Sequence, residues 1–275
     1  MKLNFLKMHG LGNDFVLLDG VSESLAITRE LVLQLCDRKF GIGCDQLLIA
    51  ESSDLPEADF KYRIFNCDGS EVEQCGNGAR CFAQFVKRQG LINRNQIRVE
   101  TLAGVFGIEI IDDCLVRVEM GQPVFDHASI PYLPDTQGTH CIEIDQQQIN
   151  FQVVSIGNPH AVIFVDDVDT IAIQEIGSQL EVDARFPQRT NVQFVQIVDS
   201  ETIKQRIFER GAGETLASGS GACAAVAVGQ AHRNLSAHVV VNMPGGKLTI
   251  DIDPASQTLF LTGPTEISFE GSVQI

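Results

Sequence analysis

Hydrophobic and polar residues alternate over short stretches along most of the chain, which is the pattern of half-buried β-strands. Each stretch is only a few residues long and is bounded by Gly, Asn, Asp or Pro, as strands usually are. The predicted strands are residues 3–8, 15–19, 46–50, 62–66, 97–101, 105–111 and 115–120, followed by 151–155, 161–165, 192–198, 203–208, 239–242, 248–252 and 259–262. The chain is therefore predicted to be mostly strand.

Helical periodicity is clear in four places. Thr28 is a suitable N-cap for a helix that runs to about Asp37. The other predicted helices span residues 79–89, 170–180 and 222–232. The last of them is made almost entirely of small apolar residues, and a helix that is apolar all round is usually fully buried.

The best domain boundary is the segment Met120–Gly138, which contains three prolines and few alternating apolar positions. A chain of 275 residues is long enough for about two domains. We predict an N-terminal domain of residues 1–118 plus 264–275, and a C-terminal domain of residues 119–263.

The two halves of the chain carry the same signature. Phe65-Asn66 is followed, after eight intervening residues, by Cys75-Gly76-Asn77-Gly78-Ala79, and Phe208-Glu209 is followed at the same spacing by Ser218-Gly219-Ser220-Gly221-Ala222. The offset between the two blocks is 143 positions throughout, and Glu71 and Glu214 share it. Each block follows a predicted strand and opens a predicted helix, so we expect two like domains related by a pseudo-twofold axis.

Such turns are candidate anion sites, because the first N–H groups of a helix have no internal partner and the helix dipole is positive there. Neither turn is a nucleotide loop, since no Lys follows Gly219-Ser220 and Gly10-Leu11-Gly12 lacks a third glycine. A small carboxylate therefore fits these sites better than a polyphosphate.

Cys75 lies at the start of the first of these helices, where the pKa of a thiol is lowered. It is a candidate base or nucleophile, the alternative being a structural cysteine. The other seven cysteines lack such a setting and are expected to be mostly small buried hydrophobes. The absence of CxxC, HExxH and paired Cys/His spacings makes a metal site improbable.

Composition excludes several classes of protein. The net charge of −16 argues against a nucleic-acid binder. No run of 18 strongly apolar residues predicts a membrane span, and the N-terminus does not have the pattern of a signal peptide. We therefore expect a cytoplasmic protein in a reducing compartment.

The motifs together resemble those of the diaminopimelate epimerase family. They are HGLGNDF (9–15), GIGCDQ (41–46), FNCDGSEVEQCGNGARC (65–81), SIGNPH (155–160), ERGAGET (209–215) and GSGACAA (219–225). The resemblance implies an α+β fold with two pseudo-symmetric, β-rich, barrel-like domains, each with a central helix, that close on a substrate cleft. It also implies a homodimer that interconverts LL- and meso-diaminopimelate, a precursor of lysine and peptidoglycan, with neither pyridoxal phosphate nor a metal as cofactor.

The same resemblance assigns roles to individual residues. Cys75 matches the first catalytic cysteine, and His160 and Glu209 match groups that tune the thiols. Matches to substrate-binding positions are Asn13, Gln46, Asn66, Gly76, Asn77, Asn158, Asn191, Glu209, Arg210, Gly219 and Ser220.

Two positions depart from the family pattern. Ser218 stands where the family has its second catalytic cysteine, and a hydroxyl ionises far less readily than a thiol. The chain is therefore expected to bind diaminopimelate but to epimerise it very slowly. Phe269 stands near a position that is often Tyr in a segment used for dimer contact, so dimerisation is expected with altered details.

Three other interpretations remain open at this point. One is a related two-base enzyme of the proline racemase or hydroxyproline epimerase type. Another is a non-catalytic amino-acid-binding protein that lost its second thiol. The third is a structural β-protein with Gly-rich turns.

Overall fold

The computed structural model describes residues 2–73, 75–134, 140–144 and 146–274. The chain forms two compact units: unit 1 comprises Met1–Glu119 and Thr262–Ile275, and unit 2 comprises Met120–Leu261. The boundaries predicted from the sequence were 118/119 and 263/264. The fold is a mixed α/β fold in which strands dominate and four α-helices are present in the described ranges.

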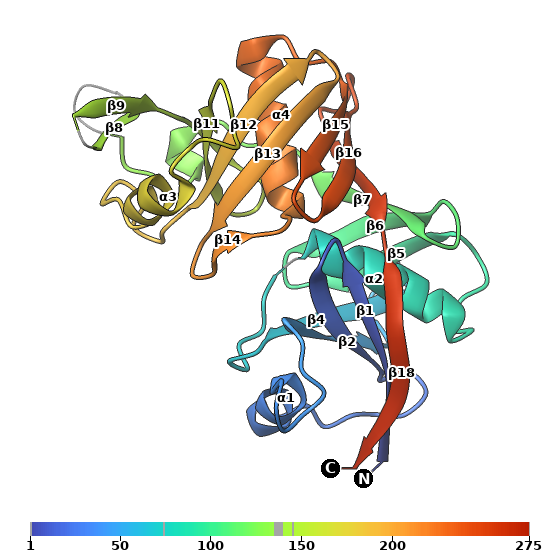
Figure 1. Cartoon of the computed structure of the whole chain (residues 1–275). Coiled ribbons are helices and arrows are strands. Elements are labelled where there is room, and N and C mark those ends of the chain that lie inside the picture. The colour runs from blue at the N-terminus through green and yellow to red at the C-terminus, as the bar shows by residue number, and fades with distance from the viewer. Residues whose placement is uncertain (1, 74, 135–139, 145, 275) are drawn as a thin grey trace. The chain divides into compact units, whose positions relative to one another are not determined.

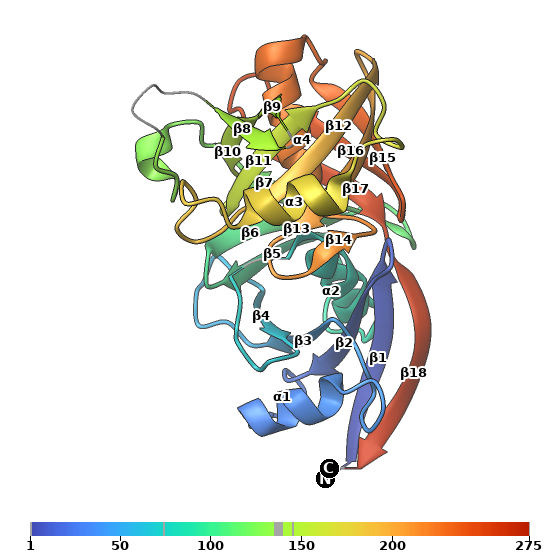
Figure 2. The ribbon, with the colours of Figure 1, turned by 60° about the vertical axis from the view of Figure 1, so that its left-hand side comes forward.

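Unit 1 is built on a sheet in the order β7-β6-β5-β4-β3-β2-β1-β18. Its strands are β1 (Lys2–Gly10), β2 (Asn13–Asp19), β3 (Gln46–Glu51), β4 (Phe60–Asn66), β5 (Gln96–Thr101), β6 (Gly104–Ile110), β7 (Leu115–Gly121) and β18 (Glu266–Gln274). Its helices are α1 (Arg29–Cys36) and α2 (Gly76–Arg88). Helix α2 packs against β1, β2, β3 and β6, so it is the central helix of this unit (Figures 1 and 2).

Unit 2 repeats this arrangement with a sheet in the order β10-β11-β12-β13-β15-β16-β17, to which β14 adds beside β13. The strands are β10 (Gln152–Ser155), β11 (Pro159–Phe164), β12 (Asn191–Asp199), β13 (Thr202–Glu209), β14 (Gly213–Thr215), β15 (His238–Met243), β16 (Gly246–Ile252) and β17 (Leu259–Pro264). Helix α4 (Gly219–Arg233) is central here and packs against β10, β11, β12, β13 and β16 (Figure 1). The unit also holds α3 (Ile173–Glu181), the 3₁₀ turn η1 (His127–Ser129) and a hairpin of β8 (Cys141–Ile144) and β9 (Gln147–Asn150).

The pairing of the strands follows the same order in both units. In unit 1, β1–β2 is antiparallel, β2–β3 parallel, β3–β4 antiparallel, β4–β5 parallel and β5–β6 antiparallel. In unit 2, the pairs β10–β11, β11–β12, β12–β13, β13–β15 and β15–β16 show the same senses in the same order. The sequence repeat is therefore a repeat of topology.

An ion pair recurs at the repeat offset. Arg63 Nε lies 2.8 Å from Glu71 Oε1 in unit 1, and Arg206 Nε lies 2.7 Å from Glu214 Oε1 in unit 2. Each glutamate follows the strand that carries its arginine and pairs with Phe65 or Phe208 across the turn. The hairpin that leads into each central helix is thus fixed by the same side-chain contact.

The central helices begin at small polar residues and are buried along most of their length. Cys75 caps α2 and Ser218 caps α4, and each is in an extended backbone conformation. Both helices begin three residues earlier than the apolar periodicity predicts, because their first turns consist of Gly, Asn and Ser. The prediction that the second central helix is buried is confirmed, since every residue from Gly221 to Gly229 is buried.

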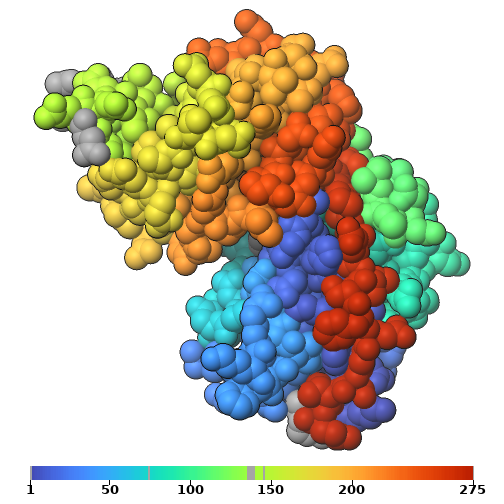
Figure 3. Space-filling model, viewed as in Figure 1, coloured from blue at the N-terminus to red at the C-terminus, as the bar shows by residue number. Residues whose placement is uncertain are grey.

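The structure adds four strands that the sequence pattern did not predict: β8, β9, β14 and β18. Strand β18 is exposed along nearly its whole length and contains Glu266, Glu270 and Gly271, so it has no continuous apolar face. It pairs with β1 from the other end of the chain (Figure 3). Of the seven cysteines other than Cys75, Cys36, Cys44, Cys81 and Cys223 are buried, so the prediction that most of these seven are buried is confirmed, and the exposed exceptions are Cys67 and Cys114.

Candidate active site

The thiol of Cys75 lies at the N-terminus of the central helix of unit 1. Its Sγ accepts a hydrogen bond from the Gly78 N–H at 3.3 Å, which makes it the side-chain cap of α2. Gly76 and Asn77 follow as the first helical residues and are buried, whereas Cys75 itself is half-buried. The arrangement places an accessible sulfur beside the free N–H groups of a helix start.

Gly78 allows this turn to close. A Cβ atom at this position would lie 2.4 Å from the Tyr62 hydroxyl and 3.4 Å from Cys75 Sγ. Tyr62 is fully buried, and burial raises its pKa well above the usual value, with the nearby Cys75 and Cys81 acting in the same direction. The hydroxyl therefore stays protonated close to the start of the helix.

Four amide side chains predicted to bind substrate lie in unit 1, three of them (Asn13, Gln46 and Asn66) at the ends of neighbouring strands and Asn77 in the first turn of α2. Asn13 Oδ1 lies 4.0 Å from Cys75 Sγ and accepts a 3.4 Å hydrogen bond from Asn77 Nδ2. Gln46 Nε2 donates to Asn66 Oδ1 at 2.9 Å, because β3 and β4 pair these two residues directly. The structure thus brings Asn13 and Asn77 together with Cys75, and links Gln46 to Asn66.

Two amide oxygens of this group are buried without a hydrogen-bond partner in the described part of the chain, namely Gln46 Oε1 and Asn77 Oδ1. Buried polar atoms in proteins are normally hydrogen-bonded, to protein, water or ligand. These oxygens are therefore available to a donor group such as an ammonium ion.

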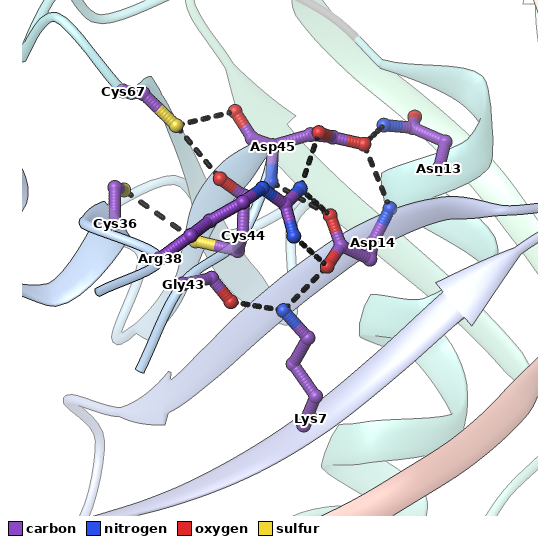
Figure 4. A network of polar contacts seen from close by, with 9 residues as sticks. All are labelled: Lys7, Asn13, Asp14, Cys36, Arg38, Gly43, Cys44, Asp45 and Cys67. Carbon is purple, nitrogen blue, oxygen red and sulfur yellow. Dashed lines mark hydrogen bonds and ion pairs between the residues drawn. The ribbon is translucent and has the colours of Figure 1, made fainter. Parts of the chain in front are cut away.

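A charged network that the sequence analysis missed supports Asn13 (Figure 4). Asp45 Oδ2 accepts from Asn13 Nδ2 at 3.0 Å and from the Asp14 N–H at 3.1 Å, while Arg38 bridges Asp14 and Asp45 at 2.6 and 2.7 Å. Lys7 forms an ion pair with Asp14 at 2.6 Å. Burial alone would raise the pKa of Asp14, but the hydrogen bonds from Arg38 and Lys7 outweigh it and lower the pKa to about 2. The only signal in the sequence was the GIGCDQ string, whose Asp45 precedes Gln46.

Unit 2 presents the same helix start with a hydroxyl in place of the thiol. Ser218 Oγ accepts from the Gly221 N–H at 3.3 Å, the bond that Cys75 makes with Gly78. Ser218 and Gly219 are buried, and Ser220 is half-buried. The two positions are therefore equivalent in topology and in their local hydrogen bond.

The remaining predicted residues of unit 2 lie at strand ends equivalent to those of unit 1. His160 is fully buried and its Nε2 contacts Asn158 Oδ1 at 2.8 Å, so that the amide oxygen accepts from an Nε2–H tautomer. Burial lowers the pKa of His160 to about 3, and the positive charge of Arg210 acts in the same direction. The histidine is consequently neutral at neutral pH.

The Glu209-Arg210 pair is held by its own contacts. The Arg210 N–H donates to Asn191 Oδ1 at 3.0 Å, and Arg210 Nη1 donates to the Gln188 carbonyl at 3.1 Å. Glu209 Oε1 accepts from the Thr215 hydroxyl at 2.5 Å. The structure thus brings Asn191 to Arg210.

Glu181, at the end of α3, was missed by the sequence analysis. It is buried, and its Oε1 accepts from the Gly211 N–H at 2.8 Å and pairs with Arg189 Nη1 at 3.3 Å. It therefore fixes the backbone immediately after Arg210. An acidic residue at a helix end has no distinctive pattern, so the sequence offered no signal for this role.

Comparisons with known proteins agree with this arrangement. The profile of the diaminopimelate epimerase family matches residues 5–125 and 152–268. A diaminopimelate epimerase of Teredinibacter turnerae is 48% identical over 276 residues, with both chains covered in full.

Solved structures with lower sequence identity share the fold. A hydroxyproline epimerase from Agrobacterium vitis, solved with bound trans-4-hydroxy-L-proline, is 15% identical, with a TM-score of 0.75 over 99% of this chain and 91% of its own. A phenazine biosynthesis protein of the PhzF family from Bacillus anthracis is 17% identical, with a TM-score of 0.71 over the full length of both chains. At these identities the likeness concerns the fold alone. Because its family profile and its relative both extend over nearly all of its length, this chain belongs to the diaminopimelate epimerase family.

Proposed function

We propose that this protein interconverts LL- and meso-diaminopimelate by moving the proton on one α-carbon, without pyridoxal phosphate or a metal. The observation that carries the proposal is the equivalence of Cys75 and Ser218, each capping the central helix of one repeat. Inversion of a stereocentre needs one group that removes a proton and another that delivers one on the opposite face. A duplicated unit provides two such positions.

Cys75 is the base or acid for one face of the carbon. The free N–H groups at the start of α2, from Gly76 onward, and those at the start of α4, including Gly219 and Ser220, stabilise the negative charge that develops on the substrate carboxylate. Proton abstraction beside a carboxylate creates an enediolate, so this electrostatic stabilisation is a large part of the catalysis. His160 and Glu209 tune the reacting groups, and neutral His160 does so as a hydrogen-bonding group and not as a cation.

Recognition of the substrate follows from its two ammonium and two carboxylate groups. The amide oxygens of Gln46 and Asn77 are suited to an ammonium group, and Asn13, Asn66, Asn158 and Asn191 add further donors and acceptors. Arg210 is suited to a carboxylate. The reaction supplies the meso compound used for lysine and peptidoglycan synthesis in the cytoplasm.

Ser218 makes this chain a slow epimerase. A serine hydroxyl is a far weaker acid than a thiol, so proton delivery or removal at this position is impaired. We expect Ser218→Cys to raise turnover by about 10²–10⁴-fold, the range contributed by a positioned acid or base. The double variant Cys75→Ser/Ser218→Cys is the matched control and should again be slow. Equal rates for the parent and Ser218→Cys would contradict the assignment.

A non-catalytic amino-acid-binding protein is the second candidate, and Ser218 is the observation that favours it. Incubation of LL-diaminopimelate in heavy water separates the two, because deuterium uptake at the α-carbon needs at least one working base. Binding without uptake would support the binding protein, whereas uptake that is lost in Cys75→Ser would support the epimerase. Parallel assays with proline and hydroxyproline test the racemase type of enzyme. That alternative is supported only by the similarity of the fold.

We further propose a homodimer. Strand β18 exposes Ile267 and Phe269, two large apolar side chains that a second copy could cover. Sedimentation of the parent and of Phe269→Glu checks this, with a shift toward monomer expected in the variant. Within the described ranges, no helix has the length and apolar character required to cross a membrane.

A further inference from the structure

Three cysteine thiols that the proposed reaction does not use lie together in unit 1 (Figure 4). Cys36 is the last residue of α1, Cys44 lies in the loop before β3, and Cys67 follows β4. Cys44 Sγ lies 3.4 Å from Cys36 Sγ, and the Cys44 N–H donates to the Cys36 carbonyl at 3.4 Å. Cys67 Sγ lies 2.8 Å from the Cys44 carbonyl oxygen and 3.1 Å from that of Asp45.

The three sulfurs differ in exposure. Cys36 and Cys44 are buried, whereas Cys67 is exposed. An oxidant in solution therefore reaches Cys67 first, and the buried pair is reached through it. In the described part of the chain, no group of three His, Cys, Asp or Glu side chains is arranged to hold a metal ion, so the cluster does not have the character of a metal site.

The ionisation of the three thiols is also unequal. The neighbouring thiols of Cys36 and Cys44 lower the pKa of Cys67, with the positive charge of Arg38 acting in the same direction and partial burial and the negative charge of Asp14 acting against it. The contacts with Cys67 and burial raise the pKa of Cys44 far above the usual value. The carbonyl oxygens of Cys44 and Asp45 accept the S–H of Cys67 in its thiol form, which favours the protonated sulfur and acts against this lowering of the pKa of Cys67. The thiolate is the reactive form of cysteine, so ionisation and exposure select the same residue.

We propose that Cys67, Cys44 and Cys36 form a peroxide-sensitive thiol relay, in which Cys67 is oxidised first and a Cys36–Cys44 disulfide is the final product. This site of modification lies beyond the proposed epimerase reaction. It needs only a hydroperoxide as oxidant.

The chemistry balances in three steps. The Cys67 thiolate attacks the peroxide, its S–O bond forms as the O–O bond breaks, and hydrogen peroxide leaves one water after protonation. Cys44 then loses its proton and attacks Cys67 sulfur, which forms a disulfide and releases the second water. Cys36 loses its proton to the leaving Cys67 and attacks Cys44 sulfur, which transfers the disulfide to the buried pair and restores the Cys67 thiol.

The movement required is small. A disulfide has an S–S length near 2.05 Å, so the sulfurs of Cys36 and Cys44 must approach by about 1.4 Å. Cys36 directly precedes the loop 37–45 and Cys44 lies within it; the loop also contains Gly41 and Gly43 and has no regular secondary structure. Arg38 and Asp45 belong to this loop and hold Asp14 and Asn13. Closure of the disulfide is therefore expected to disturb Asn13, a consequence that rests on the proposed function.

The test is peptide mapping by mass spectrometry of the reduced protein after a brief treatment with hydrogen peroxide. We expect a product lighter by two hydrogen atoms with Cys36 linked to Cys44, reversed by dithiothreitol. Cys67→Ser should slow its formation at least about tenfold, because the remaining two thiols are buried and protonated. Cys114→Ser is the matched control, since Cys114 is also exposed in unit 1, and it should behave like the parent.

Two further variants separate the steps. Cys36→Ser should accumulate the Cys44–Cys67 disulfide, and Cys44→Ser should leave Cys67 as a sulfenic acid that dimedone traps. If either buried variant fails to fold, the parent's own time course decides, since dimedone capture at Cys67 must precede the disulfide. A Cys36–Cys44 disulfide that forms equally fast in Cys67→Ser, or no disulfide in the parent, would overturn the relay.

The effect on the site is measured separately by calorimetric binding of diaminopimelate to the reduced and oxidised protein. We expect weaker binding after oxidation and recovery after reduction. Unchanged binding after full conversion would remove the link to the site and leave the disulfide map as the test of the relay. Absence of binding in the reduced protein would count against the proposed function and not against the relay.

Discussion

A comparison of the cap residues of the two central helices shows which part of the role of Cys75 is structural and which part is chemical. Cys75 Sγ and Ser218 Oγ accept the same hydrogen bond, each from the N–H three residues later. Serine is among the best N-cap residues. The thiol at residue 75 is therefore not required by the helix, which points to chemistry as the reason for its presence.

Cys75→Ser should keep the helix and lose the reaction. Because serine accepts the capping hydrogen bond, we expect the free energy of unfolding to stay within about 0.5 kcal/mol of the parent, whereas Cys75→Ala should cost about 1 kcal/mol. Both variants should lose deuterium exchange at the α-carbon of LL-diaminopimelate. Urea unfolding and exchange followed by NMR are the measurements, and full exchange in Cys75→Ser would contradict the role of the thiol.

Asp45 illustrates a supporting residue that acts through its neighbour. It accepts from Asn13 Nδ2 and from Arg38, so Asp45→Ala should release Asn13. Loss of such a hydrogen bond is worth about 1 kcal/mol, so we expect diaminopimelate to bind about three- to tenfold more weakly by calorimetry. Asp68→Ala is the control, because Asp68 is an exposed turn residue that contacts Ser70. Equal weakening in both variants would argue against a specific role for Asp45.

At the level of elements, alternation and turn residues were sufficient to predict most strands and all four helices. The pattern failed where an element lacks an apolar face of its own, as in β18, whose position depends on pairing with β1 from the opposite end of the chain. The hydrophobic pattern also placed the first residue of each central helix too late in the chain. Gly76 and Gly219 have no side chain that could contribute to a helical periodicity.

The site was predictable to a similar extent and for similar reasons. The family motifs identified Cys75, Ser218 and the amides as site residues, because all of them lie in sequence strings that contain glycines and amides at fixed spacing. Glu181 and Arg38 could not be found in this way. Their roles arise from contacts over 30 and 24 positions, with the Gly211 N–H and Asp14 respectively, and only the folded chain makes these contacts.

Gly177 in α3 is a case where local preference and packing oppose each other. Alanine is favoured over glycine inside a helix by about 1 kcal/mol. A Cβ at this position, however, would lie 2.5–2.8 Å from ring and Cβ atoms of Phe208, which is buried in β13. We expect Gly177→Ala to destabilise the protein by about 1–3 kcal/mol in urea unfolding, as overpacked cores do. Ser178→Ala, one residue further along α3, should change stability by less than about 0.5 kcal/mol, and a stabilised Gly177→Ala would contradict the packing argument.

At the scale of the whole molecule, the repeat explains why the chemistry is distributed as it is. The strand ends that carry Asn13, Gln46 and Asn66 in unit 1 carry Asn158, Asn191 and Glu209 in unit 2, in the same register relative to their neighbours. The supporting ion pair of Arg63 and Glu71 is repeated as well. The two repeats differ at the residues that would react, because the cap of α2 is a thiol and the equivalent cap of α4 is a hydroxyl.

His160 in unit 2 and Asp14 in unit 1 are two groups whose ionisation couples folding to pH. His160 has a pKa of about 3 in the folded chain against a usual value of 6.5, so the unfolded chain binds an additional proton between these values. Stability should therefore fall as pH drops below 6.5, by up to about 1.4 kcal/mol per pH unit from this group. Asp14 has a pKa of about 2 in the folded chain against a usual value of 3.8. Its contribution to stability is therefore lost only as the pH falls below 3.8.

Urea unfolding above and below pH 6.5 tests the contribution of His160. His160→Gln removes the titrating ring, so its free energy of unfolding should fall less steeply than that of the parent as pH decreases from 6.5 toward 4. The slope is the informative quantity, because the substitution itself changes packing in a fully buried place. His232→Gln is the matched control, since His232 is exposed near the end of α4 and should leave the parent's slope intact. A slope that is the same in all three proteins would show that His160 takes up its proton in the folded state, and would then allow it to act near the reacting groups as a cation.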